Sequence, residues 1–129
     1  MRPVVELLQH ISAEPVRFDP DRLHRLFRQL GERSAEAMLS RALEELAVRL
    51  SLCEDHWHAE SWPDLQKCAR SIIAISEQIG LTTLARVAGD VTGATARRDL
   101  AAVGATLARL VRIGERSLTA VWDLRDLSV

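Results

Sequence analysis

The chain has 129 residues, a formal net charge of −1 and an apolar content of 47%. This length suits one domain, and the balanced charge argues against a general binder of nucleic acid or of anionic membranes, because both need a basic surplus. No apolar run approaches the roughly 18 residues that span a bilayer, and charges interrupt the N-terminus too early for a signal peptide. We expect a soluble, cytoplasmic protein that binds neither nucleic acid nor membrane.

Helix-forming residues dominate the composition. Leu and Ala are the most frequent residues, Tyr is absent and β-branched residues are sparse, so local preferences favour helices over strands. Apolar residues recur at steps of three and four, which is the helical period, and no segment alternates as a strand would. The sequence therefore predicts an all-α fold.

Proline and glycine delimit the first two predicted helices. A short helix is predicted over residues 3–11, because Pro3 suits the first helical position. The pair Asp19-Pro20 is a second start signal, since a carboxylate can cap the helix and proline lacks an N–H that would be unpaired there. Gly31 should end this helix in a left-handed conformation.

Longer amphipathic helices should follow, over residues 32–55, 62–80, 82–93 and 96–125. Residues 56–60 are interpreted as a linker. Such helices can bury their apolar stripes only against one another, so we expect an antiparallel four-helix bundle with the short N-terminal helices over one end. Residues 1–16 are assigned to an N-terminal helix and linker and residues 17–129 to the bundle. Gly104 and Gly114, within the last predicted helix, are interpreted as points of close helix contact.

Enzymatic and metal-binding motifs are missing from the sequence. There is no phosphate-cradling glycine loop, zinc-protease motif or nucleophile elbow. Cys53, His56 and His58 lie close together, but a structural zinc site needs a second ligand pair, for which Cys68 is a poor substitute. Both cysteines are interpreted as small buried hydrophobes. We expect no enzyme activity, no metal and no cofactor.

The segment 68–81 is the most informative part of the chain. It reads CARSIIAISEQIGL and resembles the signature helix of histidine-containing phosphotransfer (HPt) domains, approximately Ala-His-x-Leu-Lys-Gly-Ser-x-x-x-Leu-Gly. Ala69 matches the alanine, Ile72 the leucine and Gly80 the terminal glycine. The resemblance covers roughly residues 17 to 124 in the right order, and it implies an HPt-type bundle and a role in bacterial two-component phosphorelay signalling.

The sequence departs from the family pattern at the positions that take part in phosphotransfer. Arg70 occupies the position of the phosphorylated histidine, Ile73 that of the lysine, Ala74 that of the glycine and Ile75 that of the serine. Phosphotransfer needs a neutral imidazole nitrogen that can attack a phosphoryl group. A guanidinium stays protonated and has no such lone pair, so Arg70 cannot take this role.

A helical projection places the outer face of this segment away from its apolar stripe. In the family, this face docks the receiver domain of a response regulator or the matching part of a histidine kinase. The resemblance thus implies a protein that binds a response-regulator receiver domain or a histidine kinase without accepting phosphate itself. The candidate partner-binding residues are Gln66, Lys67, Arg70, Ile73, Ala74 and Glu77.

Two alternatives remain open. One is a homo-oligomeric helical assembly or scaffold protein, in which Trp57, Trp62 and Trp122 form a cluster within the contact between copies; a homodimer is its simplest form. The other is phosphotransfer through a non-standard histidine, His56 or His58.

Overall fold

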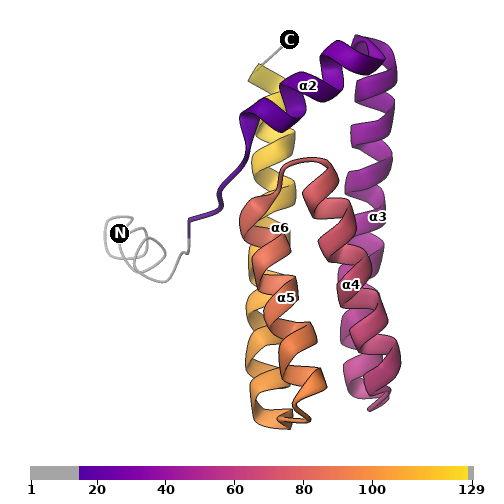
Figure 1. Ribbon diagram of the computed structural model, residues 1–129, viewed down its shortest axis with the longest axis vertical. Helices are drawn as coiled ribbons and strands as arrows, with labels where there is room; N and C mark the ends of the chain where they lie inside the picture. The colour runs from indigo at the N-terminus through magenta and orange to yellow at the C-terminus, as the bar shows by residue number, and fades with distance from the viewer. Residues whose placement is uncertain (1–14, 128–129) are drawn as a thin grey trace, which may run out of the picture.

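The computed structural model describes residues 15–127, with side chains up to Asp123. This part of the chain is all helical and contains no strand, which confirms the predicted all-α class. The helix predicted over residues 3–11 lies outside the described residues. The described helices are α2 (Pro20–Leu30), α3 (Glu32–His58), α4 (Trp62–Gln78), α5 (Thr82–Ala96) and α6 (Leu100–Leu127) (Figure 1).

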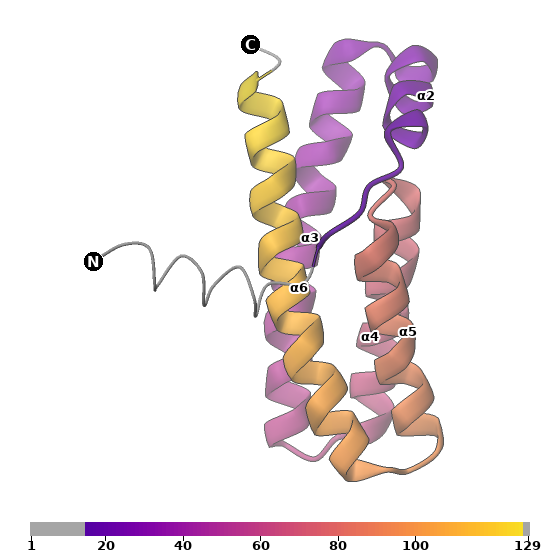
Figure 2. The same ribbon diagram turned by 90° about the vertical axis from the view of Figure 1, so that its left-hand side faces the viewer.

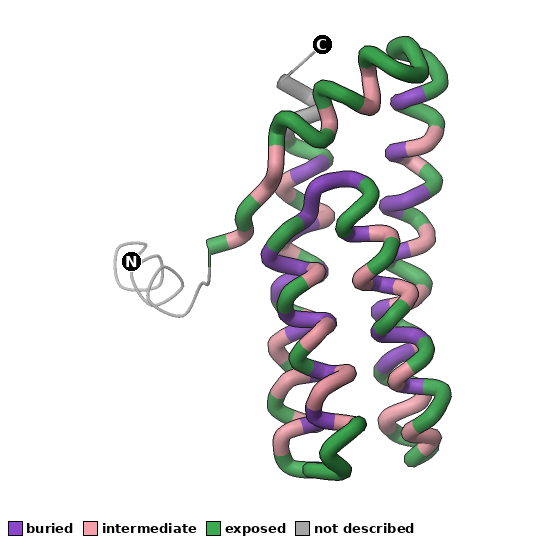
Figure 3. The backbone as a smooth tube through the Cα atoms, viewed as in Figure 1, coloured by how far each residue is buried: buried purple, intermediate pink, exposed green. Residues whose placement is uncertain are grey.

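Helices α3 to α6 lie side by side, each antiparallel to the next (Figures 1 and 2). Helix α4 packs against α3 and α5, and α6 packs against α5 and α3, so the four helices enclose one core. Buried positions line the inward sides of these helices (Figure 3). The largest fully buried side chains are Leu46, Leu65, Ile72, Ile79, Leu81, Leu84, Leu110, Ile113, Val87, Val91, Val103 and Val121.

Helix α2 lies across the end of the molecule where α3 and α6 extend beyond the α4–α5 turn (Figure 1). It begins as the sequence predicts, because a carboxylate oxygen of Asp19 accepts hydrogen bonds from the backbone N–H groups of Asp21 and Arg22. It ends at Gly31, whose φ of 80° suits glycine and whose N–H donates to the Phe27 carbonyl.

Residues 17–19, which precede α2, are hydrogen-bonded to the α4–α5 turn at Gly80 and the residues after it. The φ of Gly80 is 80°, and a Cβ on it would lie 2.8 Å from the carbonyl oxygen of Asp19. The Asp19 N–H donates to the Gly80 carbonyl at 2.8 Å. The Arg17 N–H donates to Thr83 Oγ1 at 2.8 Å, and Thr82 Oγ1 donates to the Arg17 carbonyl at 3.1 Å. These bonds place α2 at the edge of the α4–α5 pair.

The predicted linker over residues 56–60 is wrong in its first half. Helix α3 continues to His58, and only residues 59–61 separate it from α4. Trp57 follows Cys53 by four residues, so it continues the apolar stripe and packs against the core. This packing extends the helix past the point where the sequence shows its last aliphatic residue. The turn is made by Glu60, whose φ is 53°.

The junction between the last two helices also differs from the prediction. Helix α5 continues to Ala96 and α6 begins at Leu100, not at residue 96. Arg98 has a φ of 57°, a left-handed conformation that interrupts a helix. Asp99 then accepts a hydrogen bond from the Ala102 N–H at 3.1 Å, as a helix cap does.

Both glycines inside α6 lie beneath side chains of α3. A Cβ on Gly114 would lie 2.5 Å from Leu50 Cδ1, and one on Gly104 would lie 3.0 Å from the Trp57 ring. A separation under 3.0 Å is well inside van der Waals contact. The close helix contact inferred from the sequence therefore occurs at these positions.

Candidate protein-docking face

The six residues singled out by the sequence lie on one side of α4, opposite its core-facing side. Lys67, Arg70, Ala74 and Glu77 are exposed, whereas Gln66 and Ile73 are partly buried. The core-facing residues of α4 are Leu65, Cys68, Ala69, Ile72 and Ser76. The buried stripe predicted for this helix is therefore confirmed, and Arg70 is accessible to solvent.

Four of these residues form a row along the seam between α4 and α5. The row runs from Gln66 through Arg70 and Ile73 to Glu77, at spacings of four, three and four residues that keep side chains on one side of a helix. At one end, Gln66 Nε2 donates to the carbonyl oxygen of Thr92 in α5 at 3.4 Å. At the other end, Glu77 lines a hollow shared with α5. The row therefore follows the seam along most of α4.

Helix α5 contributes further residues to this surface, which the family pattern does not point to. Ala85 and Gly89 are small and partly buried, and Arg86 is exposed. A Cβ on Gly89 would have no neighbour within 4 Å, so the surface above it is open. The signal in the sequence is a small residue at every fourth position, 85, 89 and 93. We call the α4 row together with Ala85, Arg86 and Gly89 the α4–α5 face.

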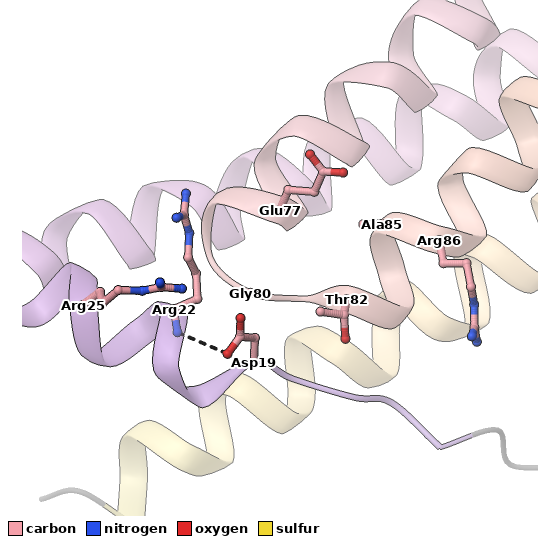
Figure 4. A pocket seen from close by; sticks show the side chains of 8 residues that line it. All are labelled: Asp19, Arg22, Arg25, Glu77, Gly80, Thr82, Ala85 and Arg86. Atoms are coloured by element: carbon pink, nitrogen blue, oxygen red, sulfur yellow. Dashed lines mark hydrogen bonds between the residues drawn. The ribbon is translucent and has the colours of Figure 1, made fainter.

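A hollow of about 570 Å³ lies at the upper end of this face, where α2 crosses it (Figure 4). Arg22 and Arg25 project from α2 and lie close to each other, while Arg86 points away from them. Arg22 is held by a bond from its Nε to the Gln78 carbonyl at 3.2 Å. Three arginines and two carboxylates line the hollow, so it carries a positive excess. Its lining residues are Asp19, Arg22, Arg25, Glu77, Gly80, Thr82, Ala85 and Arg86.

A second hollow, of about 590 Å³, lies at the lower end of the face. Gln66 belongs to both the row and this hollow, and Leu100, 53% exposed, lies at its rim. The hollow is more apolar than the upper one, since Trp62 and Val103 also contribute to it. The lining residues are Trp62, Pro63, Gln66, Thr95, Ala96, Arg98, Leu100 and Val103.

Arg70 and Ile73 differ in how they are held. Among the side chains described, those of residues 15–123, none forms a hydrogen bond or ion pair with the Arg70 side chain, so its guanidinium can form charge-assisted bonds with another molecule. Ile73 packs against the hydrophobic core and presents only part of its side chain. The centre of the face thus combines a solvent-exposed cation with a partly buried apolar side chain.

The histidines lie away from this centre. His56 and His58 are at the C-terminal end of α3, beside the α3–α4 turn. Arg70 lies eight residues beyond Trp62, about 12 Å along the axis of α4. Neither histidine therefore shares the position of Arg70 on the face.

The residues considered for a zinc site are not brought together. Cys53 is completely buried, whereas His58 is exposed. Within the described part of the chain, no three His, Cys, Asp or Glu residues are placed to hold a metal ion. Nor does any helix in that part combine the length and the apolar character needed to cross a bilayer.

Within one chain, the three tryptophans do not lie together. Trp57 and Trp62 do pack together, with ring centroids 5.6 Å apart and ring planes at 60°. Trp122 lies 18 residues beyond Gly104, which contacts Trp57, and this separation corresponds to roughly 27 Å along α6. Because α6 runs the full length of the molecule, the third tryptophan is at the opposite end.

Comparison with known proteins adds no relative. No protein-family model matches the chain, and no curated protein or solved structure shows significant similarity to it.

Proposed function

We propose that this protein is an HPt-like domain that binds a receiver domain or a histidine kinase of a two-component system through its α4–α5 face, without accepting phosphate. The observation that carries the proposal is the exposed Arg70, which stands mid-face where the resemblance places the phosphoacceptor histidine. Its four antiparallel helices and the order of its motifs are compatible with an HPt-type bundle.

The chemistry of the face favours binding over phosphotransfer. Arg70 cannot form a phosphoramidate bond at neutral pH, because its guanidinium holds its proton and lacks a free nucleophilic nitrogen. Ile73 offers no positive charge to a phosphoryl group, unlike the lysine of the family pattern. Such a domain can occupy a partner's docking surface without discharging its phosphate, and thereby act as an adaptor, competitor or brake.

Charge and shape on the face indicate the kind of partner surface it fits. Arg70 and Arg86 are exposed cations on the face, Lys67 is an exposed cation beside it on α4, and Arg25 extends the positive region at the upper hollow. Ile73 and the open surface over Gly89 supply a small apolar area between these charges. A partner with acidic groups around a shallow apolar contact would be complementary to this arrangement.

A binding assay with matched variants tests the docking proposal. Purified receiver domains and histidine kinases from the source organism would be titrated by calorimetry against the wild type, Arg70→Glu and Arg112→Glu. Arg112 is an exposed arginine on α6, so its reversal changes net charge equally without touching the face. We expect Arg70→Glu to weaken binding by about tenfold or more, and Arg112→Glu to bind as the wild type does.

A second pair of variants tests the apolar part of the contact. Ile73→Asp should abolish binding, whereas Val48→Asp on α3, at a side chain that is 54% exposed, should not. Circular dichroism must show that Ile73→Asp remains folded, because Ile73 also packs against the core. Equal binding by all variants, or no binding to any receiver or kinase, would reject the proposed face.

Phosphotransfer is tested separately. Incubation of the protein with a phosphorylated receiver domain should yield no acid-labile phosphoprotein. A labelled band that disappears when His56 or His58 is replaced would instead establish transfer through a non-standard histidine.

One alternative is a homo-oligomeric assembly or scaffold protein, whose interface would need exposed hydrophobic side chains. The large exposed hydrophobics are Leu30, Val48, Leu100 and Trp122. They are distributed over α2, α3 and both ends of α6, and a stable dimer interface needs a contiguous patch. Light scattering distinguishes the two functions: an obligate oligomer supports assembly, and a monomer supports docking of a different protein.

A further inference from the structure

The two cysteines of the chain meet inside the molecule. Cys53 of α3 is completely buried and Cys68 of α4 is 4% exposed, and both are free thiols. The Cys68 thiol donates to the carbonyl oxygen of Arg49 in α3, with Sγ 3.1 Å from that oxygen. Cys53 lies one helical turn beyond Arg49 and its side chain points back over that turn, so both thiols pack against the same turn of α3. The sequence indicated that each thiol would be buried, but not that the two would be partners.

The surroundings make the two thiols chemically different. Hydrogen bonding from the neighbouring Cys53 thiol lowers the pKa of Cys68, burial opposes this effect, and the nearby Arg49 guanidinium lowers the pKa further. The same hydrogen bond, together with burial, raises the pKa of Cys53. One thiol is thus disposed to become a thiolate while the other remains its proton-bearing neighbour.

Glu45 and Arg49 form the polar side of this pair. Arg49 Nε lies 2.7 Å from Glu45 Oε1, and both side chains are partly exposed. Glu45 opposes the thiolate, because its negative charge raises the pKa of Cys68. The two charges near Cys68 therefore act in opposite directions, the cation favouring its thiolate and the anion disfavouring it.

We propose that Cys53 and Cys68 are a redox-active pair that closes to an intramolecular disulfide when the protein encounters a peroxide. The proposal stands on the burial of both thiols against one turn of α3 and on the Arg49–Glu45 pair beside Cys68. It is independent of the docking proposed for the α4–α5 face.

The reaction balances with hydrogen peroxide as the oxidant. The Cys68 thiolate attacks one peroxide oxygen, the O–O bond breaks, and the departing hydroxide takes up a proton to become water. Cys68 is then a sulfenic acid. The Cys53 sulfur attacks the Cys68 sulfur, the S–O bond breaks, and the proton of Cys53 leaves with the hydroxyl group as a second water. Two thiols are oxidised, one peroxide is reduced, and a thiol reductant reverses the change.

Intact-mass measurement of the native protein tests the proposal. Treatment with hydrogen peroxide should lower the mass by about 2 Da, abolish alkylation of both cysteines together after unfolding, and leave the protein monomeric without reductant. Dithiothreitol should restore both thiols. A gain of about 16 or 32 Da at either cysteine with no loss of 2 Da, disulfide-linked dimers, or two thiols that remain fully alkylatable would each overturn it.

Variants separate a redox pair from two buried thiols. Cys53→Ala should convert the mass loss into a gain of about 16 Da or more, because the sulfenic acid has no resolving partner. Arg49→Gln should slow thiol loss and Glu45→Gln should accelerate it, each by about three- to tenfold, because they shift the thiolate population of Cys68 in opposite directions. Changes in the same direction, or equal rates, would show that access alone governs oxidation and would contradict the proposed role of Arg49.

Discussion

Replacement of Gly114 by alanine tests the close approach of α3 and α6. A Cβ at this position would lie 2.5 Å from Leu50 Cδ1 and 2.9 Å from Cδ2. Leu50 is 5% exposed and belongs to the hydrophobic core, so its side chain has little room to move away. Gly89, in the interior of α5, is a matched control, because a Cβ there would have no neighbour within 4 Å.

The two substitutions should therefore change stability in different ways. Each gains about 1 kcal/mol from the higher helix propensity of alanine. At Gly114 the new methyl group would lie about 1 Å or more inside the usual carbon–carbon contact of about 3.5–4.0 Å, and overpacking of this kind costs about 1–3 kcal/mol. We expect Gly89→Ala to raise the free energy of unfolding by about 0.5–1 kcal/mol and Gly114→Ala to lower it by about 0–2 kcal/mol.

Urea unfolding followed by circular dichroism measures both changes. The double variant Gly114→Ala/Leu50→Ala isolates the contact, because the shortened side chain at position 50 makes room for the methyl group. In the Leu50→Ala background, Gly114→Ala should be stabilising, which corresponds to a coupling of about 1–3 kcal/mol. The reasoning fails if Gly114→Ala stabilises the wild type as much as Gly89→Ala does.

Three further substitutions probe other local features of the fold. The buried hydroxyl of Ser76 finds no hydrogen-bond partner among the described residues, so Ser76→Ala should raise the free energy of unfolding by about 1 kcal/mol; a loss of stability in the urea assay would contradict this. Gly80→Ala should lower the free energy of unfolding by about 2–4 kcal/mol, because φ is 80° and the Cβ would lie 2.8 Å from the Asp19 carbonyl oxygen. A decrease of less than about 1 kcal/mol would contradict this, because it would show that the turn adapts to the methyl group. Arg98→Gly should raise the melting temperature by about 4 °C, because φ is 57°, whereas Arg97→Gly, at a φ of −79°, should not.

Local signals predicted the helix boundaries that depend on neighbouring residues alone. Asp19-Pro20 starts α2 and Gly31 ends it, as the sequence indicated. The end of α3 and the start of α6 were misplaced, because they depend on tertiary packing and backbone conformation. Trp57 extends α3 by packing against the core and against Gly104 of α6, and no pattern in the chain identifies that partner.

In the candidate site, too, local features were predictable from the sequence and tertiary ones were not. The helical projection identified which side of α4 is buried, so the exposure of Arg70 was predictable. The sequence did not show that α5 borders this side of α4, because tertiary packing decides which helices are neighbours. The hydrogen bond from Gln66 to the Thr92 carbonyl shows that they are. The meeting of Cys53 with Cys68 is likewise a property of the α3–α4 register.

NMR shift mapping tests the proposed docking most directly. The isotope-labelled protein would be titrated with an unphosphorylated receiver domain from the source organism, and the shifted backbone amides would be mapped onto the structure. Docking as proposed predicts changes along the row from Gln66 to Glu77 and at Arg86 on α5. Changes confined to α6 or to the exposed side of α3 would contradict it, as would the absence of any shift with every receiver and kinase domain tried.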